Sequence, residues 1–164
     1  MMAALASAFM LLSYFPYLTY AIPAIAGLFI MVIVIEINRK WAAGAYIASA
    51  VLVFFLAEPE SKLMYIGFFG YYPVLKALID GMKKPIIEWI IKLIVFNAAV
   101  LIIYFCFAKA FGVSIEDFGE FGKYGAVALL GFGNVVFVLY DIAVSRMAMM
   151  YMGIVHPKIK KYLK

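Results

Sequence analysis

The run PIIEWIIKLIVFNAAVLIIYFCFAKAF, residues 85–111, decides the fold class. It is 27 residues long and carries three charged side chains, Glu88, Lys92 and Lys109. A helix that crosses a bilayer needs about 20 mostly apolar residues, and a proline such as Pro85 suits the first turn of a helix. The apolar residues are continuous rather than alternating with period two, which argues against a barrel strand. The run therefore predicts a membrane-spanning helix from Pro85 to about Phe111.

The composition of the whole chain agrees with this prediction. Of 164 residues, 68% are hydrophobic and 14% are charged, and the mean hydropathy is +1.06. Soluble domains of ordinary composition are about 45–50% apolar and about 25% charged. This chain has too little polar surface for a water-soluble globule. We expect one transmembrane helical domain over residues 1–164, with no separate soluble domain.

Five further apolar runs lie between polar breaks and predict five more spans. The chain is therefore expected to be an all-α integral membrane protein, a bundle of about six transmembrane helices. The other predicted spans run from about Ala3 to Leu18, Ala21 to Ile37, Trp41 to Ala57, Leu63 to Ile79 and Tyr124 to Met147.

The stretch GYYPVLKALIDGMKKP, residues 70–85, ends the fourth predicted span. Gly67, Gly70 and Pro73 are expected to bend this helix in mid-span, because glycine and proline weaken the helical hydrogen-bond ladder. From Lys76 onward the stretch is interpreted as the cytoplasmic end of the span. On this interpretation it mainly fixes topology, and any ligand binds near the opposite face.

Basic residues give the expected orientation, since cytoplasmic loops carry an excess of Lys and Arg. If both termini are cytoplasmic, eight basic loop and tail residues lie inside and three lie outside. We therefore expect a multi-pass membrane protein with both termini in the cytoplasm. The inner set is Arg39, Lys40, Lys83, Lys84, Lys158, Lys160, Lys161 and Lys164, and the outer set is Lys62, Lys109 and Lys123.

The net charge of +5 does not indicate a nucleic-acid partner. The basic residues cluster at the ends of predicted spans, and no basic face interleaved with aromatic residues is present. We expect membrane lipid around the chain and no nucleic acid bound to it.

Ionisable residues close to the spans have two readings. Inside a membrane such residues are costly and point to function. However, Lys76 with Asp80 and Glu88 with Lys92 have the i, i+4 spacing of helix-stabilising pairs. Asp141 belongs to the inner part of the last span, where it can pair with other helices. The structural reading is favoured for these charges.

The sequence gives little support for catalysis. The only histidine is His156, in the basic tail, and a Ser-His or Cys-His arrangement would have to use it. There is no glycine-rich phosphate loop and no cluster of His and Cys with metal-ligand spacing. We expect no enzymatic activity, no cofactor and no bound metal.

Polar and aromatic residues near mid-membrane and the outer face are the candidate ligand contacts. Tyr17 and Tyr20 belong to the aromatic segment SYFPYLTYAIP, which is read either as an interfacial belt or as a lid over a small ligand. Asn97 and Asn134 need partners inside a bilayer, so each faces either another helix or a cavity. Tyr65 and Tyr104 are added for their depth and chemistry.

The first span contains ALASA, residues 4–8, in which Ala4 and Ala8 lie one helical turn apart. This segment resembles the AxxxA motif on the first helix of the substrate-binding S component of energy-coupling factor vitamin transporters. The run IPAIAGLFIMVIVIEINRKWAAGAYIASAVLVFFLA, residues 22–57, also looks like that family's paired second and third spans. The resemblance covers nearly the whole chain as a pattern of size, charge and six spans.

The resemblance implies an S-component bundle that captures a small micronutrient, a vitamin or a precursor, from outside. Transport would then need a separate coupling membrane subunit and two cytosolic ATPases, and Ala4 and Ala8 would face the coupling subunit. The ligand would bind near the outer face. On this chain the candidate contacts are Tyr17, Tyr20, Tyr65, Asn97, Tyr104 and Asn134.

Two other functions remain open at the level of sequence. One is a membrane scaffold or complex subunit without transport activity, in which the polar residues hold helices together. The other is a small channel or exporter, in which copies of the chain line a pore with Asp141 or Arg146.

Overall fold

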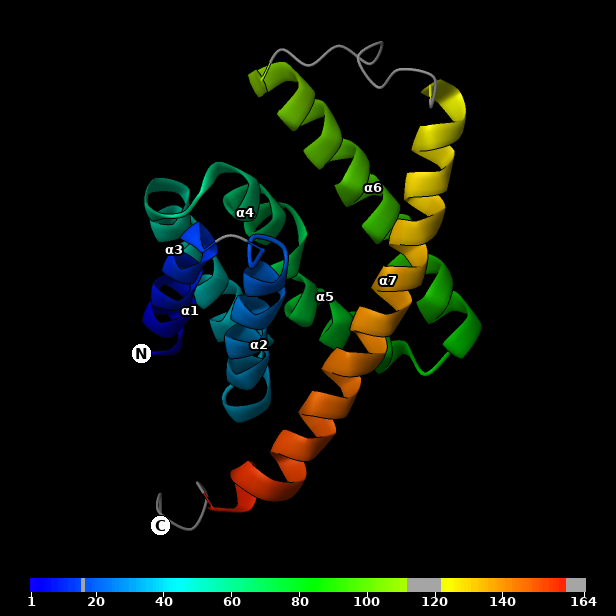
Figure 1. Cartoon of the computed structure of the whole chain (residues 1–164). Coiled ribbons are helices and arrows are strands. Elements are labelled where there is room, and N and C mark those ends of the chain that lie inside the picture. Colours follow the sequence, from blue (N-terminus) through cyan, green and yellow to red (C-terminus); the bar gives the residue numbers. More distant parts are fainter. Residues whose placement is uncertain (16, 112–121, 159–164) are drawn as a thin grey trace.

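The computed structural model describes residues 1–15, 17–111 and 122–158 (Figure 1). This part of the chain is helical throughout its regular structure and contains no strand. The helices are α1 Met2–Met10, α2 Ala21–Glu36, α3 Arg39–Leu56, α4 Pro59–Met64, α5 Tyr72–Ile79, α6 Pro85–Phe111 and α7 Gly122–Met150.

Three of the described helical segments are long and apolar enough to cross a membrane. They are Arg39–Leu56 in α3, Pro85–Tyr104 in α6 and Leu130–Lys158, which begins in α7 and continues through a π-helical turn at Tyr151–Val155. Met2–Tyr14 and α2 are shorter apolar helices. Large apolar side chains such as Phe55 and Ile86 are exposed along these helices, as expected of a surface that meets lipid. The predicted all-helical class is confirmed for the described residues, and three helical segments have the length and composition of membrane spans.

The first helix ends earlier than predicted. After α1 a short 3-10 turn covers Leu11–Tyr14, and Phe15 has extended backbone angles (φ −77°, ψ 130°). The residue before a proline is driven out of the helical region by contact with the proline ring, and residue 16 is a proline. The helical segment therefore stops at Tyr14 rather than near Leu18.

The fourth predicted span is interrupted near its middle. Helix α4 passes into a π-helical turn at Tyr65–Phe69, and α5 starts afresh at Tyr72. Pro73 cannot donate to the carbonyl of Phe69, which helps to break the ladder. Gly70 also lies so close to the Tyr46 ring that a Cβ atom there would be 2.7 Å from a ring carbon. The predicted bend at these residues is confirmed.

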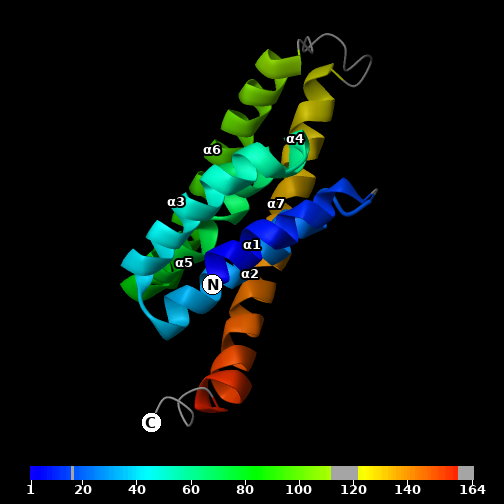
Figure 2. The same cartoon turned by 90° about the vertical axis from the view of Figure 1, so that its left-hand side faces the viewer.

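The helices form two groups joined by α2. Figures 1 and 2 show α1, α2 and α3 side by side on one side of the molecule, with the long α6 and α7 crossing on the other. One buried cluster contains Met10, Ile22 and Val53, and a second contains Phe68 and Phe137. Helix α2 also contacts α5 and α7.

The two basic turns of the chain lie at one end of the molecule, which we call the basic end. Arg39 and Lys40 follow the α2–α3 turn, and Lys83 and Lys84 lie between α5 and α6. Arg39 connects the start of α3 to the last turn of α5, because its Nη1 donates to the carbonyl oxygen of Ala77 at 3.4 Å. The α2–α3 turn and the C-terminal end of α7 point the same way in Figure 1, and α4 lies at the opposite end.

Candidate functional site

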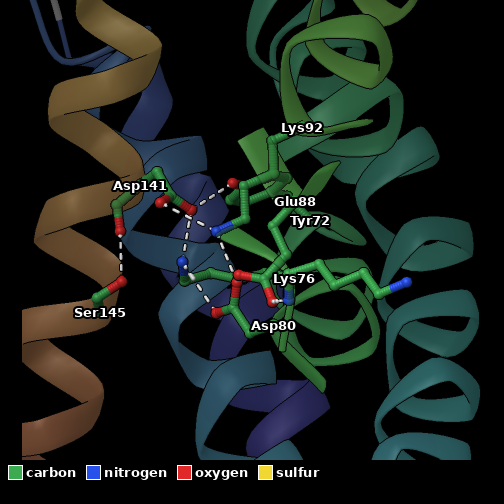
Figure 3. Close-up of polar contacts among 8 residues, drawn as sticks. Tyr72, Lys76, Asp80, Glu88, Lys92, Asp141 and Ser145 are labelled. Atoms are coloured by element: carbon green, nitrogen blue, oxygen red, sulfur yellow. Dashed lines mark hydrogen bonds and ion pairs between the residues drawn. The ribbon is translucent and has the colours of Figure 1, made fainter. Parts of the chain in front are cut away.

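Four charged side chains from α5, the 3-10 turn Asp80–Met82 that follows it, α6 and α7 meet beside the interruption in the fourth span (Figure 3). Lys76 Nζ lies 2.5 Å from Asp141 Oδ1 and 3.2 Å from Asp80 Oδ2. Lys92 Nζ lies 2.6 Å from Asp80 Oδ1 and 3.3 Å from Asp141 Oδ2. Each lysine thus bridges both carboxylates, and the four contacts close a ring. We call Lys76, Asp80, Lys92 and Asp141 the charge cluster.

Exposure differs sharply within the charge cluster. The side chains of Lys76, Lys92 and Asp141 are 8%, 5% and 4% exposed, whereas that of Asp80 is 42% exposed. Three charges are therefore held inside the protein and one carboxylate reaches the surface. Asp80 is therefore the most accessible member of the charge cluster.

Neighbouring groups complete the polar contacts of Asp141. The hydroxyl of buried Tyr72 donates to Asp141 Oδ1 at 2.5 Å, so this oxygen accepts from both Tyr72 and Lys76. Ser145 Oγ donates to the backbone carbonyl of Asp141 at 2.9 Å (Figure 3). Lys92 Nζ also lies 5.3 Å from the centroid of the Trp89 ring, within range of a cation–π contact.

Helix periodicity explains how α5 presents its part of the site. Tyr72, Lys76 and Asp80 are spaced by four residues, which places them on one face of the helix. Helices α6 and α7 run antiparallel, and Lys92 and Asp141 occupy facing turns where they cross. Removing one partner from a buried ion pair leaves an uncompensated charge, at a cost of about 3–5 kcal/mol. The charge cluster therefore holds α5, α6 and α7 together.

The break between α4 and α5 leaves polar groups beside the charge cluster. Pro73 has no N–H for the carbonyl of Phe69, and α2 approaches this carbonyl closely at Gly27. A Cβ atom at Gly27 would lie 2.4 Å from Phe69 O and 3.4 Å from the hydroxyl oxygen of Tyr140. The Tyr140 hydroxyl is buried and has no hydrogen-bond partner in the structure. The interrupted helix and the unpaired Tyr140 hydroxyl therefore lie beside Asp141 of the charge cluster.

The expected ion pairs are partly confirmed and partly corrected. Lys76 does pair with Asp80, and Asp141 does pair with other helices. Lys92 was expected to pair with Glu88, but it contacts Asp80 and Asp141 instead. Glu88 instead accepts a hydrogen bond from the backbone N–H of Lys84 at 3.1 Å. The free N–H groups in the first turn of a helix stabilise an acidic side chain there. This explains why Glu88 contacts the backbone of Lys84 rather than the side chain of Lys92.

The six predicted ligand contacts do not form one site in the structure. Asn97 and Asn134 bond to each other, with Nδ2 to Oδ1 distances of 2.9 Å and 3.1 Å. This is the interhelical bond that the sequence left open as one alternative. Tyr65 is buried in the other helix group, with its hydroxyl 2.8 Å from Ser49 Oγ. Tyr104 is partly buried on α6.

The remaining two predicted contacts lie in the α1–α2 connection. Tyr17 is 99% exposed and has a left-handed backbone (φ 73°). The hydroxyl of Tyr20 donates to Glu60 Oε2 at 3.3 Å, which ties this connection to α4. Partial burial and the negative charge of Glu60 raise the pKa of Tyr20 above its usual value. These contacts attach the connection to α4.

Sequence reasoning missed the charge cluster as a unit. Two clues were present: Lys76, Lys92 and Asp141 each interrupt an apolar run, and Tyr72, Lys76 and Asp80 share one helix face. Their partners come from three helices, and the spacing along the chain does not show which helices meet.

The two alanines of the predicted partner interface, Ala4 and Ala8, are both exposed on α1.

Within the described residues, no group of three or more His, Cys, Asp or Glu side chains is placed to hold a metal ion.

Comparisons with protein families, with curated proteins and with solved structures gave no match to this chain.

Proposed function

We propose that this chain is a membrane-embedded substrate-binding subunit for the uptake of a small micronutrient. The observation that carries the proposal is the charge cluster beside an interrupted helix. Ionisable residues inside a membrane are expensive and usually mark a pathway or a binding site. Discontinuous helices provide such sites in many transporters. In this proposal the chain crosses a bacterial or archaeal plasma membrane six times, with both termini in the cytoplasm.

The charge cluster replaces the outer-face contacts expected from the sequence as the proposed binding site, and its chemistry favours a ligand that carries a carboxylate. Two lysines converge on the carboxylates of Asp80 and Asp141, and Asp80 is the exposed one. A ligand carboxylate that replaces Asp80 would keep both lysines paired, so no buried charge would be left without a partner. Asp141 would remain bound to Lys76 and Tyr72 and would hold the lysines in place.

The proposed partners are a coupling membrane subunit and cytosolic ATPases. Their motivation is the sequence, which has no phosphate-binding loop and resembles S components. The exposure of Ala4 and Ala8 supports this part of the proposal, because small residues on a helix surface let another helix approach closely.

Thermal-shift measurements on the purified protein test the proposal. The panel contains vitamins and precursors with a carboxylate, each paired with its neutral amide or ester. We expect a carboxylate ligand to raise the Tm by several degrees, and its neutral analogue to have no effect. Lys92→Gln should abolish the shift, whereas Asp80→Asn should keep or strengthen it, because the competing carboxylate is gone.

Two control variants locate the ligand. Arg146→Gln changes an exposed charge on α7 outside the charge cluster and should leave the shift intact. Asn134→Ala tests the alternative set of contacts nearer the opposite end. The proposal fails if no compound stabilises the protein and no coupling subunit or ATPase co-purifies with it from its native membrane.

A membrane scaffold or complex subunit is the second candidate, because the charges of the cluster already satisfy one another. In that case the charge cluster fixes helix positions only. Partner proteins would then co-purify equally with the wild type and with Asp80→Asn, and no compound of the panel would raise the Tm of either.

A further inference from the structure

An apolar groove runs between α3 and α5 on the surface of the molecule, away from the charge cluster. It has a volume of about 150 Å³, and only apolar atoms are accessible in it. Because it is open along its side, it faces the surroundings of the helices rather than an enclosed cavity. We call it the α3–α5 groove. Its lining residues are Ala43, Tyr46, Tyr71, Val74, Leu75 and Leu78.

The two ends of the α3–α5 groove have different linings. At one end the rings of Tyr46 and Tyr71 meet edge to face, with centroids 6.0 Å apart. The hydroxyl of Tyr46 is occupied by a hydrogen bond to Ile66 O at 2.7 Å, so the ring offers only its apolar part. Tyr71 and Leu78 are seven helical rises apart, a length of about 10 Å. Leu78 lies toward the basic end, and we call this end of the groove its mouth.

Positive charge is concentrated at the mouth. The Arg39 guanidinium donates to Ala77 O, one residue before Leu78, so it lies across the mouth of the groove. This contact uses one of the five N–H groups of the arginine, and the others remain for a further acceptor. Lys40 is exposed next to it, and Lys83 and Lys84 are exposed beyond the end of α5.

Two more features mark this mouth as the level of a lipid headgroup. Trp41 is 67% exposed in the first turn of α3, and exposed tryptophans are enriched where a membrane meets water. Asn38 caps α3, because its side chain accepts from the N–H of Trp41 at 2.9 Å. The positive end of this 18-residue helix therefore points toward the mouth as well.

We infer that the α3–α5 groove binds one anionic phospholipid. An acyl chain lies against Ala43, Val74 and Leu75, and the phosphate contacts Arg39 and Lys40. An apolar groove with basic residues at its mouth matches a lipid in both chemistry and direction, and basic sites of this kind between helices bind anionic lipids. The inference is independent of the proposed uptake function.

Lipid retention measured by native mass spectrometry tests the inference. The protein is purified in detergent and mixed with equal amounts of phosphatidylglycerol and phosphatidylcholine of identical acyl chains. We expect the wild type to retain one phosphatidylglycerol in preference to phosphatidylcholine. The double variant Arg39→Gln/Lys40→Gln should retain it about tenfold to thirtyfold less, since each basic residue near a headgroup contributes roughly a fivefold effect.

A second variant tests the groove itself. Ala43→Trp fills the α3–α5 groove and should abolish retention while leaving the basic residues in place. The matched controls are Ala48→Trp, on an exposed part of α3, and Arg146→Gln, an exposed charge on α7; both should retain the lipid. Circular dichroism confirms that each variant is folded before retention is compared.

Three outcomes would overturn the inference. These are equal retention of both lipids by the wild type, unchanged retention in Ala43→Trp, and a loss in Arg146→Gln as large as that in Arg39→Gln/Lys40→Gln. The last result would assign the binding to the overall positive charge of the protein rather than to this groove.

Discussion

Among the described residues, two polar contacts between α6 and α7 differ in whether an exposed side chain takes part in them. In the first, each amide of the Asn97–Asn134 pair donates to the other and to a backbone carbonyl of its own helix, Leu93 O at 2.8 Å and Leu130 O at 2.7 Å. Both donors of each amide are therefore used. In the second, Lys92 pairs with Asp141, but the ring closes only through Asp80, which is partly exposed.

The difference separates a contact that joins helices from a contact that can exchange partners. A neutral pair with no spare donor has little to offer a ligand, and any replacement costs hydrogen bonds. A ring of charges with one carboxylate at the surface can replace that carboxylate by another anion. The predictions below test this contrast.

The largest effect is expected for Asp141→Asn. This change removes the negative charge that Lys76 and Lys92 share, so the free energy of unfolding should fall by about 3–5 kcal/mol. Equilibrium unfolding in mixed micelles measures it. The double variant Asp141→Asn/Lys92→Met should recover part of the loss, because it also removes one of the stranded positive charges. If the free energy of unfolding of Asp141→Asn lay within about 1 kcal/mol of the wild-type value, Asp141 would not belong to a buried ion-paired site.

A smaller loss is expected for Asn97→Ala. It leaves Asn134 without its partner, and interhelical hydrogen bonds in membrane proteins contribute about 0.6–1.7 kcal/mol. The same unfolding assay measures the loss. The double variant Asn97→Leu/Asn134→Leu should be close to wild type, because both polar groups are gone. If the double variant lost a ligand shift found in the wild type, the amide pair would belong to the binding site after all.

Asp80→Asn should cost less than about 1 kcal/mol, since partly exposed ion pairs contribute little and are screened by salt. In this variant Lys76 and Lys92 both keep their ion pairs with Asp141. Comparing unfolding at low and high salt should show a salt-dependent difference between wild type and Asp80→Asn. A loss as large as that of Asp141→Asn would mean that Asp80 is not replaceable, which would contradict the proposed exchange with a ligand carboxylate.

The smallest effect is expected at the other end of the molecule, at Tyr20. The raised pKa of Tyr20 means that the folded protein favours the neutral phenol. Stability from the Tyr20–Glu60 contact should therefore be intact below pH 10, the ordinary pKa, and decline as the pH rises through the raised value. Tyr20→Phe should remove this decline and cost under about 1 kcal/mol at neutral pH. Unfolding measured from pH 8 to pH 11 checks both points; an unchanged decline in Tyr20→Phe would assign it to other groups.

Much of the secondary structure could be predicted from local sequence. The long apolar runs placed α2, α3 and α6 within about two residues, and Gly67, Gly70 and Pro73 located the break in the fourth span. The end of the first helix was missed because the effect of a proline on the preceding residue was not applied to Phe15. In each case the deciding interaction lies within a few residues along the chain.

The candidate site depends on contacts between distant residues. Glu88 and Lys92 have the i, i+4 spacing of a helix ion pair, so the sequence predicted that they contact each other. In the folded chain Lys92 faces α5 and α7, where the carboxylates of Asp80 and Asp141 together attract it more strongly than the single carboxylate of Glu88. The amides of Asn97 and Asn134 were likewise placed at the right depth, but only the crossing of α6 and α7 shows that they bond to each other.

The sequence by itself determined that this chain is helical, apolar enough for a membrane, and basic at particular turns. Those properties follow from the composition and periodicity of continuous segments, which act locally. The tertiary structure alone decided that Lys76, Asp80, Lys92 and Asp141 form one ring, and that Arg39 lies at the mouth of the α3–α5 groove. Those contacts depend on which helices pack together, because charges on separate helices can satisfy one another only after packing brings them within a few ångströms.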